Sequence, residues 1–165
     1  MSSIVIYQSS TGFTERYAKW IAEELKCRAV SIKEMTESDL TGSDTVIFGG
    51  WIMGNGIMGY DKIKDKGIRR LVVFAVGSSE DSEETRRVII AVNQLGDTPF
   101  FYLPGGMRFD KLNFFVRLML KQMKKSIAKK TEKSEQDRYM ERVLCTNFDI
   151  SDRMYIKELV EFAGQ

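Results

Sequence analysis

One stretch near the N-terminus decides the fold: Ser3-Ile4-Val5-Ile6-Tyr7-Gln8-Ser9-Ser10-Thr11-Gly12-Phe13-Thr14-Glu15-Arg16. A short apolar run typical of a buried strand leads into a hydroxyl-rich turn with one glycine, and a helical pattern follows. The free N–H groups of a helix N-terminus form a site that suits an anion. We therefore predict a phosphate loop over Ser9–Thr14, in which the hydroxyl groups of Ser9, Thr11 and Thr14 and the backbone amides of Ser10–Thr14 face the anion. A helix cap that satisfies only its own amides is the alternative.

Apolar strands and amphipathic helices alternate along the rest of the chain. This alternation predicts an α/β fold, a doubly wound parallel sheet of five strands in the order 2-1-3-4-5 with helices on both faces. At 165 residues the chain is expected to form a single domain. The segment Asp61–Arg70 leaves room for only a stunted helix. Later strands are expected at Ala29–Ile32, Thr45–Gly49, Leu71–Val76 and Phe100–Leu103. The first helix is expected to start at Thr14 or the residue before it. Two later helices are expected to start at a capping box of Asp81 and Glu84 and at an N-cap of Ser151.

The composition excludes several classes of catalytic site. The chain contains no histidine, which rules out Ser-His-Asp and Cys-His catalysis and histidine-containing metal sites. Cys27 and Cys145 lie far apart and form no C-x-x-C motif, so we expect two reduced thiols and no metal site. Any redox chemistry must therefore be carried by a bound organic cofactor. No catalytic acid or base is nominated.

Three segments are expected to meet at one edge of the sheet. In a doubly wound sheet, ligands bind outside the carboxyl ends of the strands, where the strand order reverses. Ser9–Thr14 follows the first strand, the glycine-rich loop Gly50–Gly56 follows the third, and Ala75–Ser79 follows the fourth. Their arrangement suits a ligand with a phosphate at one end and a flat ring at the other.

The S-x-T-G-x-T pattern of Ser9–Thr14, placed directly after an N-terminal strand, resembles the FMN-phosphate loop of the flavodoxin family. The resemblance implies a flavodoxin-like fold with FMN as the cofactor. One difference stands out, because flavodoxins usually place Asn where Phe13 stands. The resemblance also implies ring contacts from Trp51, Ile52, Met53 and Gly54 on one side of the flavin and from Gly77, Ser78 and Ser79 on the other. Trp51 would stack on the ring; ordinary core packing is its alternative role.

A strongly basic, apolar segment occupies residues 107–131. Aromatic and methionine side chains alternate there with lysines, and no acidic residue lies between Lys111 and Thr131. Such a segment predicts an amphipathic helical insertion, and Lys111–Lys130 is a candidate for peripheral contact with an anionic membrane. A core helix with solvated lysines is the alternative.

The run Tyr102-Leu103-Pro104-Gly105-Gly106-Met107-Arg108-Phe109, followed by this helix, resembles the flavodoxin-like, quinone-dependent protoporphyrinogen oxidases. Gly106, Arg108 and Phe109 match the G-x-R-[YF] positions of that branch. The loop that bears Trp51 lacks the residues expected in those oxidases.

Two functions follow from these resemblances. The first is an FMN-dependent oxidoreductase that passes electrons between a hydrophobic donor and a quinone or similar acceptor. The alternative is a small electron carrier that serves a redox partner protein. Electron-carrying flavodoxins are generally strongly acidic, whereas this chain has a formal net charge of +2. A flavodoxin-like domain without tight cofactor binding is a third reading. We expect a cytoplasmic protein, peripheral to the inner face of the membrane if the basic segment binds lipid, with no nucleic-acid partner.

Overall fold

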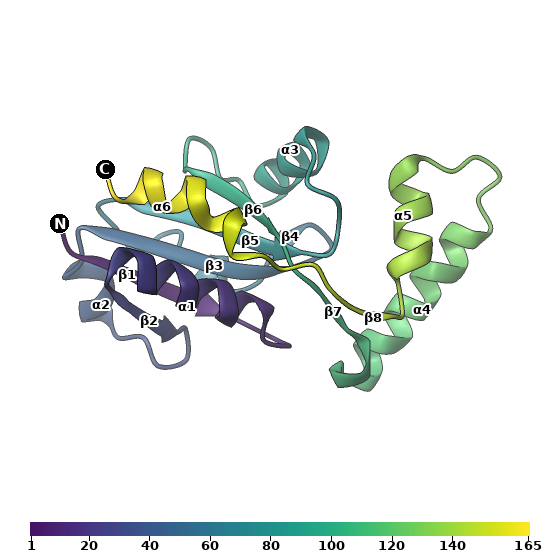
Figure 1. Cartoon of the computed structure of the whole chain (residues 1–165), viewed down its shortest axis with the longest axis horizontal. Coiled ribbons are helices and arrows are strands. Elements are labelled where there is room, and N and C mark those ends of the chain that lie inside the picture. The colour runs from purple at the N-terminus through teal and green to yellow at the C-terminus, as the bar shows by residue number, and fades with distance from the viewer.

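A computed structural model describes the whole chain, residues 1–165 (Figure 1). Its central sheet has the order β2-β1-β3-β5-β6, and each neighbouring pair along this path is parallel. Because β5 and β6 are the fourth and fifth parallel strands, the predicted α/β fold and strand order 2-1-3-4-5 are confirmed. The parallel strands are β1 (Ser3–Gln8), β2 (Arg28–Ser31), β3 (Thr45–Met53), β5 (Leu71–Gly77) and β6 (Phe100–Pro104).

The middle strands are buried on both faces, as continuous apolar runs predict. Ile47 of β3 pairs with Val5 of β1 and with Val72 of β5, and all three side chains are fully buried. This register brings the carboxyl ends of β1, β3 and β5 to one edge of the sheet.

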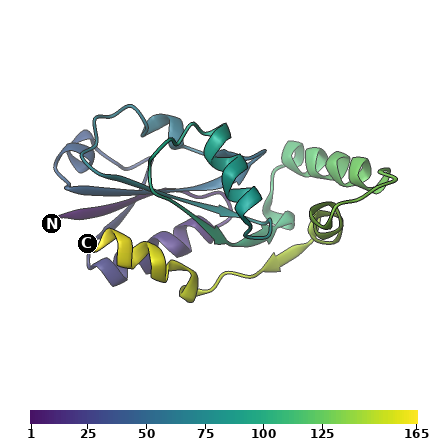
Figure 2. The same ribbon diagram turned by 90° about the horizontal axis from the view of Figure 1, so that it is seen from above.

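Helices cover both faces of the sheet (Figure 2). On one face, α1 (Phe13–Leu25) and α6 (Lys157–Ala163) bury Tyr17, Ile21 and Leu159 against the strands. On the other face, α2 (Glu37–Thr41), the 3-10 turn η1 (Tyr60–Lys62) and α3 (Glu83–Val92) pack through Leu40, Tyr60 and Ile89. Between β3 and β5 the only helical element is η1, as the short Asp61–Arg70 segment predicts.

The prediction of a loop over Gly50–Gly56 is wrong. β3 continues through Trp51 to Met53 and turns back into β4 (Gly56–Ile57), which pairs antiparallel with its end. The two turn residues, Gly54 and Asn55, both have positive φ (55° and 67°). A two-residue hairpin turn of this kind matches the twist of the strands it joins. The apolar residues after Gly49 therefore extend the sheet.

Two predicted helix caps are also wrong. Ser82 caps α3 by accepting the Thr85 N–H at 3.1 Å, whereas Asp81 pairs with Arg86. At the C-terminus, Asp152 caps the 3-10 turn η3 (Arg153–Ile156), which leads into α6. The neighbouring hydroxyl of Ser151 is held by charged partners instead, since it donates to Asp149 and accepts from Arg16. In both cases the side chain predicted to cap the helix is engaged by an arginine, and a neighbouring residue caps it instead.

The helical insertion is larger than the expected segment 107–131. Residues 106–149, here called the arm, leave the sheet as β7 (Gly106–Arg108) and return as β8 (Asn147–Asp149), which pairs antiparallel with β7. Between these strands lie the 3-10 turn η2 (Phe109–Lys111), α4 (Phe114–Ala128) and α5 (Glu135–Val143). Figure 1 shows both helices projecting beyond the sheet edge. No helix of the protein combines the length and apolar character needed to cross a bilayer.

Candidate functional site

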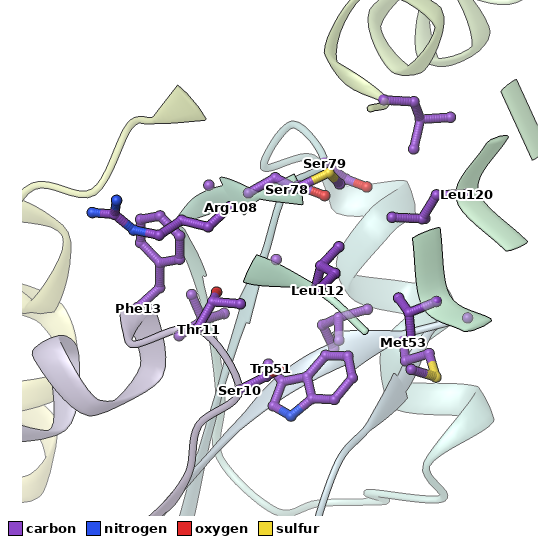
Figure 3. Close-up of a pocket in the computed structure, with 18 of the residues that line it drawn as sticks. Ser10, Thr11, Phe13, Trp51, Met53, Ser78, Ser79, Arg108, Leu112 and Leu120 are labelled. Carbon is purple, nitrogen blue, oxygen red and sulfur yellow. The ribbon is translucent and has the colours of Figure 1, made fainter. Parts of the chain in front are cut away.

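A cavity of about 340 Å³ lies at the carboxyl edge of the sheet, between the sheet and the arm (Figure 3). Its volume falls in the range typical of small-molecule sites. The segments after β1, at the end of β3 and after β5 all line it, as the sequence predicts. Of the residues nominated for cofactor binding, the lining includes Ser9, Ser10, Thr11, Phe13, Thr14, Trp51, Ile52, Met53, Gly54, Gly77, Ser78 and Ser79.

The remaining nominated residue, Gly12, shapes the loop through its backbone. It precedes the first residue of α1 and has a φ of 105°, a conformation that side chains disfavour. No side chain caps the first turn of α1. The Ser9 hydroxyl instead accepts a hydrogen bond from the Gly12 N–H at 3.1 Å, which joins the two ends of the turn before α1. The hydroxyl groups therefore do not act as an ordinary helix cap, and the positive end of α1 faces the cavity.

Thr14 is the most buried hydroxyl residue of this loop. It is only 1% exposed, yet it lines the cavity. Ser10 and Thr11, from the same loop, also line the cavity (Figure 3). Hydroxyl groups both donate and accept hydrogen bonds, so this wall suits the oxygens of an anion.

The β3–β4 hairpin forms the second wall and is held from behind by one side chain. The Asn93 carboxamide accepts the Ile57 N–H at 2.7 Å and donates to the Asn55 and Ile89 carbonyls, each at 2.8 Å. This clamp ties the hairpin to the end of α3. Trp51, half-buried, lies on the cavity side of the hairpin with Met53 (Figure 3).

Sequence reasoning missed Asn55, which also lines the cavity. A Gly-Asn pair between two apolar runs is a recognised hairpin signal. Gly54-Asn55 carried that signal, because the apolar Met53 precedes the pair and the apolar Ile57 follows it after Gly56.

The third wall, Gly77–Ser79, is supported by a buried tyrosine. The Tyr102 hydroxyl donates to the Ser79 carbonyl at 2.8 Å. Burial raises the pKa of Tyr102 above its ordinary value, so the phenol stays protonated and keeps donating. Ser79 also meets the arm, because its Oγ lies 4.0 Å from Met140 Sδ.

The arm supplies an apolar half of the cavity that sequence reasoning did not assign to the site. Its helical spacing was visible, since Val116, Leu120 and Met123 recur along one face of α4. Only the path of β7 and β8 turns that face toward the sheet edge. The apolar lining from the arm, here called the chamber, consists of Met107, Leu112, Val116, Met119, Leu120, Met123, Met140 and Leu144.

Charge is scarce in the cavity. Arg108 is its only charged lining residue. Its guanidinium lies 5.8 Å from the centroid of the Phe13 ring, and that of Arg16 lies 5.5 Å from the same centroid. No cluster of residues in the protein has the composition of a metal site.

A family model described as a flavodoxin domain matches residues 4–134. The chain belongs to the flavodoxin family. The match includes all three segments that line the sheet side of the cavity and reaches across α4 of the arm. No curated protein matches the chain.

Several solved flavodoxins are similar to it. A flavodoxin from the domain Archaea is 10% identical and aligns over 98% of this chain and 99% of its own, with a TM-score of 0.46. Flavodoxin 1 from Bacillus cereus is 17% identical over 63% of this chain and 84% of its own, with a TM-score of 0.45. The two-electron reduced flavodoxin of Megasphaera elsdenii is 16% identical over 61% of this chain and 82% of its own, with a TM-score of 0.44.

Proposed function

We propose that this protein binds FMN and works as a redox flavoprotein. The observation that carries the proposal is the uncapped N-terminus of α1, which opens into a ring-sized cavity bordered by Trp51. Membership of the flavodoxin family supports the choice of cofactor. A phosphate at the helix end and a flat ring beside the hairpin match the two halves of FMN.

The residues present fit this cofactor. Phosphate oxygens would accept from the amides of the first turn of α1 and from the hydroxyls of Ser10, Thr11 and Thr14. The isoalloxazine ring would lie between the hairpin and Gly77–Ser79, with Trp51 against one face. Bound FMN supplies the electron transfer, while the protein binds it, orients it and excludes water. No side chain is assigned as a catalytic acid or base.

The chamber favours an enzyme with a small apolar substrate over an electron carrier. Its apolar side chains lie next to the proposed ring position, where an uncharged planar molecule would be desolvated favourably. We propose a quinone-linked dehydrogenase, with the porphyrinogen chemistry of the resembling oxidases as the finer assignment. In that reaction two electrons and two protons leave the donor and reduce the quinone to the quinol.

The electron-carrier alternative rests on the acidic run Glu80–Glu84 beside the third wall. Part of that charge is neutralised, because Arg86 pairs with Asp81 at 2.6 Å. The remaining exposed acidic side chains would be the docking face for a partner protein.

The outer side of α4 supports a peripheral contact with anionic lipid through Lys111–Lys130. Phe114 and Phe115 are 66% and 79% exposed, and their rings touch edge to face. Leu118 extends this apolar strip, and Lys121 and Lys125 flank it on the same helix. Apolar side chains inserted between headgroups, with cations facing lipid phosphates, are typical of interfacial helices.

Reconstitution with FMN tests the cofactor. The purified protein is incubated with FMN, excess flavin is removed by gel filtration, and the visible spectrum is recorded. A flavin band that co-elutes with the protein is the expected result, and a colourless protein would refute the proposal. The FMN-loaded protein is then assayed with a porphyrinogen and an apolar quinone. Turnover identifies the enzyme, whereas reduction only through a partner protein identifies the carrier.

A further inference from the structure

The single charged side chain in the cavity has no ionic partner. Arg108 ends β7 and is half-buried, and none of the ion pairs in the protein includes it. A guanidinium that is partly withdrawn from water and has no carboxylate partner is available to bind an anion.

Its position shows where that anion would bind. The guanidinium lies over the ring of Phe13, the first residue of α1 (Figure 3). The charge is therefore held near the first turn of α1, and the hydroxyl residues Thr11 and Thr14 line the same cavity. A helix N-terminus and a cation repel each other unless an anion binds between them.

A second arginine on the same ring is already neutralised. Arg16 also stacks on Phe13, but it donates to Asp149 and to the Ser151 hydroxyl, both at 2.7 Å. Phe13 has no polar side-chain atom, so it supports the two guanidinium groups without competing for the anion. Of the two, only Arg108 is free for a ligand.

We propose that Arg108 binds the phosphate of the flavin and makes the site selective for FMN over riboflavin. This inference rests on the proposed function, because it assigns a residue to the same cofactor site. A guanidinium forms paired, charge-assisted hydrogen bonds with phosphate oxygens, which neutral amides and hydroxyls alone do not supply. The arm thus contributes to the cofactor site through its first strand as well as to the chamber.

A comparison of two flavins tests this assignment. Apo-protein is titrated with FMN and with riboflavin, and quenching of flavin fluorescence gives each dissociation constant. We expect Arg108→Met to weaken FMN binding about 10- to 100-fold and to change riboflavin binding less than about twofold. Arg108→Lys should fall in between, since it keeps the charge and loses the paired geometry. Arg117→Met, a cation of α4 outside the cavity lining, is the matched control and should leave both constants unchanged.

Unchanged riboflavin binding also reports that the variant pocket is intact. Equal losses for FMN and riboflavin would overturn the proposal and make Arg108 a structural support of the loop. Unchanged FMN affinity would overturn it as well; a raised KM confined to carboxylate-bearing substrates would then assign the arginine to a substrate anion. A wild-type protein that binds neither flavin would refute the proposed function itself.

Discussion

At the scale of single residues, Trp51 is the side chain expected to hold the flat ring. Replacement by Leu removes an aromatic surface worth about 0.5–1.5 kcal/mol beyond burial. We therefore expect Trp51→Leu to weaken FMN binding about 2- to 12-fold and to reduce the quenching of flavin fluorescence.

The second tryptophan provides the control. Trp20 packs edge to face on Tyr17 in α1 and does not line the cavity. Trp20→Leu should lower thermal stability while leaving the FMN dissociation constant unchanged. Equal FMN affinity in Trp51→Leu and the wild type would contradict stacking on the flavin and show that Trp51 serves only in packing.

The ion pair between Asp149 of the arm and Arg16 of α1 depends on the protonation state of the Asp149 carboxyl. Burial raises the pKa of this carboxyl, but hydrogen bonds from Ser151 and Arg16 outweigh it and hold the pKa below its ordinary 3.8. A lowered pKa stabilises the folded state above the unfolded-state value, and this contribution is lost as pH falls through the folded-state value. Because the pair with Arg16 is partly exposed, its contribution is at most about 1 kcal/mol.

Thermal unfolding against pH measures this contribution. Asp149→Asn should melt up to about 3 °C below the wild type at neutral pH. The difference should shrink as pH falls below about 4, where the wild-type carboxyl takes up a proton. A constant difference from neutral pH to pH 2 would show that the carboxylate charge is not what stabilises the contact between the arm and α1.

At the scale of elements, α4 is apolar on two sides with different consequences. The inner side lines the chamber, whereas the outer side exposes Phe114, Phe115 and Leu118. We expect the protein to float with vesicles that contain anionic lipid at low salt, and less with neutral vesicles or at high salt. The variants Phe114→Ser/Phe115→Ser and Lys121→Glu/Lys125→Glu should each lose most of this binding.

A charge change elsewhere on the surface serves as the control for flotation. Lys62 ends η1 and Lys66 follows it; both are exposed, and neither takes part in an ion pair. Lys62→Glu/Lys66→Glu changes the net charge equally and should still float. If this variant lost flotation to the same degree, the overall charge of the protein and not α4 would govern lipid binding.

Elements defined by local pattern were predictable, and those defined by competing partners were not. The β1–loop–α1 unit follows from an apolar run, a glycine that adopts positive φ and a helical stripe, all within a few residues. The end of β3 was predicted as a loop because its glycines are typical of loops, and the Gly54-Asn55 hairpin signal was not taken into account. The caps at Asp81 and Ser151 failed because Arg86 and Arg16 engage those side chains.

At the scale of the whole molecule, the chamber exists because the arm projects from the sheet edge and presents one side of α4 to the cavity. Leu120 of α4 lines it, and Leu118, two residues earlier, is 45% exposed on the outer side. In the FMN-loaded protein, Leu120→Asp should raise the KM for an apolar quinone at least about tenfold, because it places a charge in the apolar space proposed for the substrate. FMN content should not change.

The paired variant Leu118→Asp tests whether the inner side is responsible. It adds the same charge to the same helix and should leave quinone KM unchanged. Similar kinetics in the two variants would contradict a substrate site in the chamber and favour the electron-carrier function.

The sequence by itself determined the parallel sheet, its strand order and the three segments that meet at its edge. These depend on short-range periodicity and on the general rule that ligands bind where the strand order reverses. Only the tertiary structure placed the chamber beside those segments and Arg108 over Phe13. Both depend on the pairing of β7 with β8, whose strands lie far apart in the chain. Helical spacing shows which residues share a face of α4, but the return path of the chain decides that this face lines the cavity.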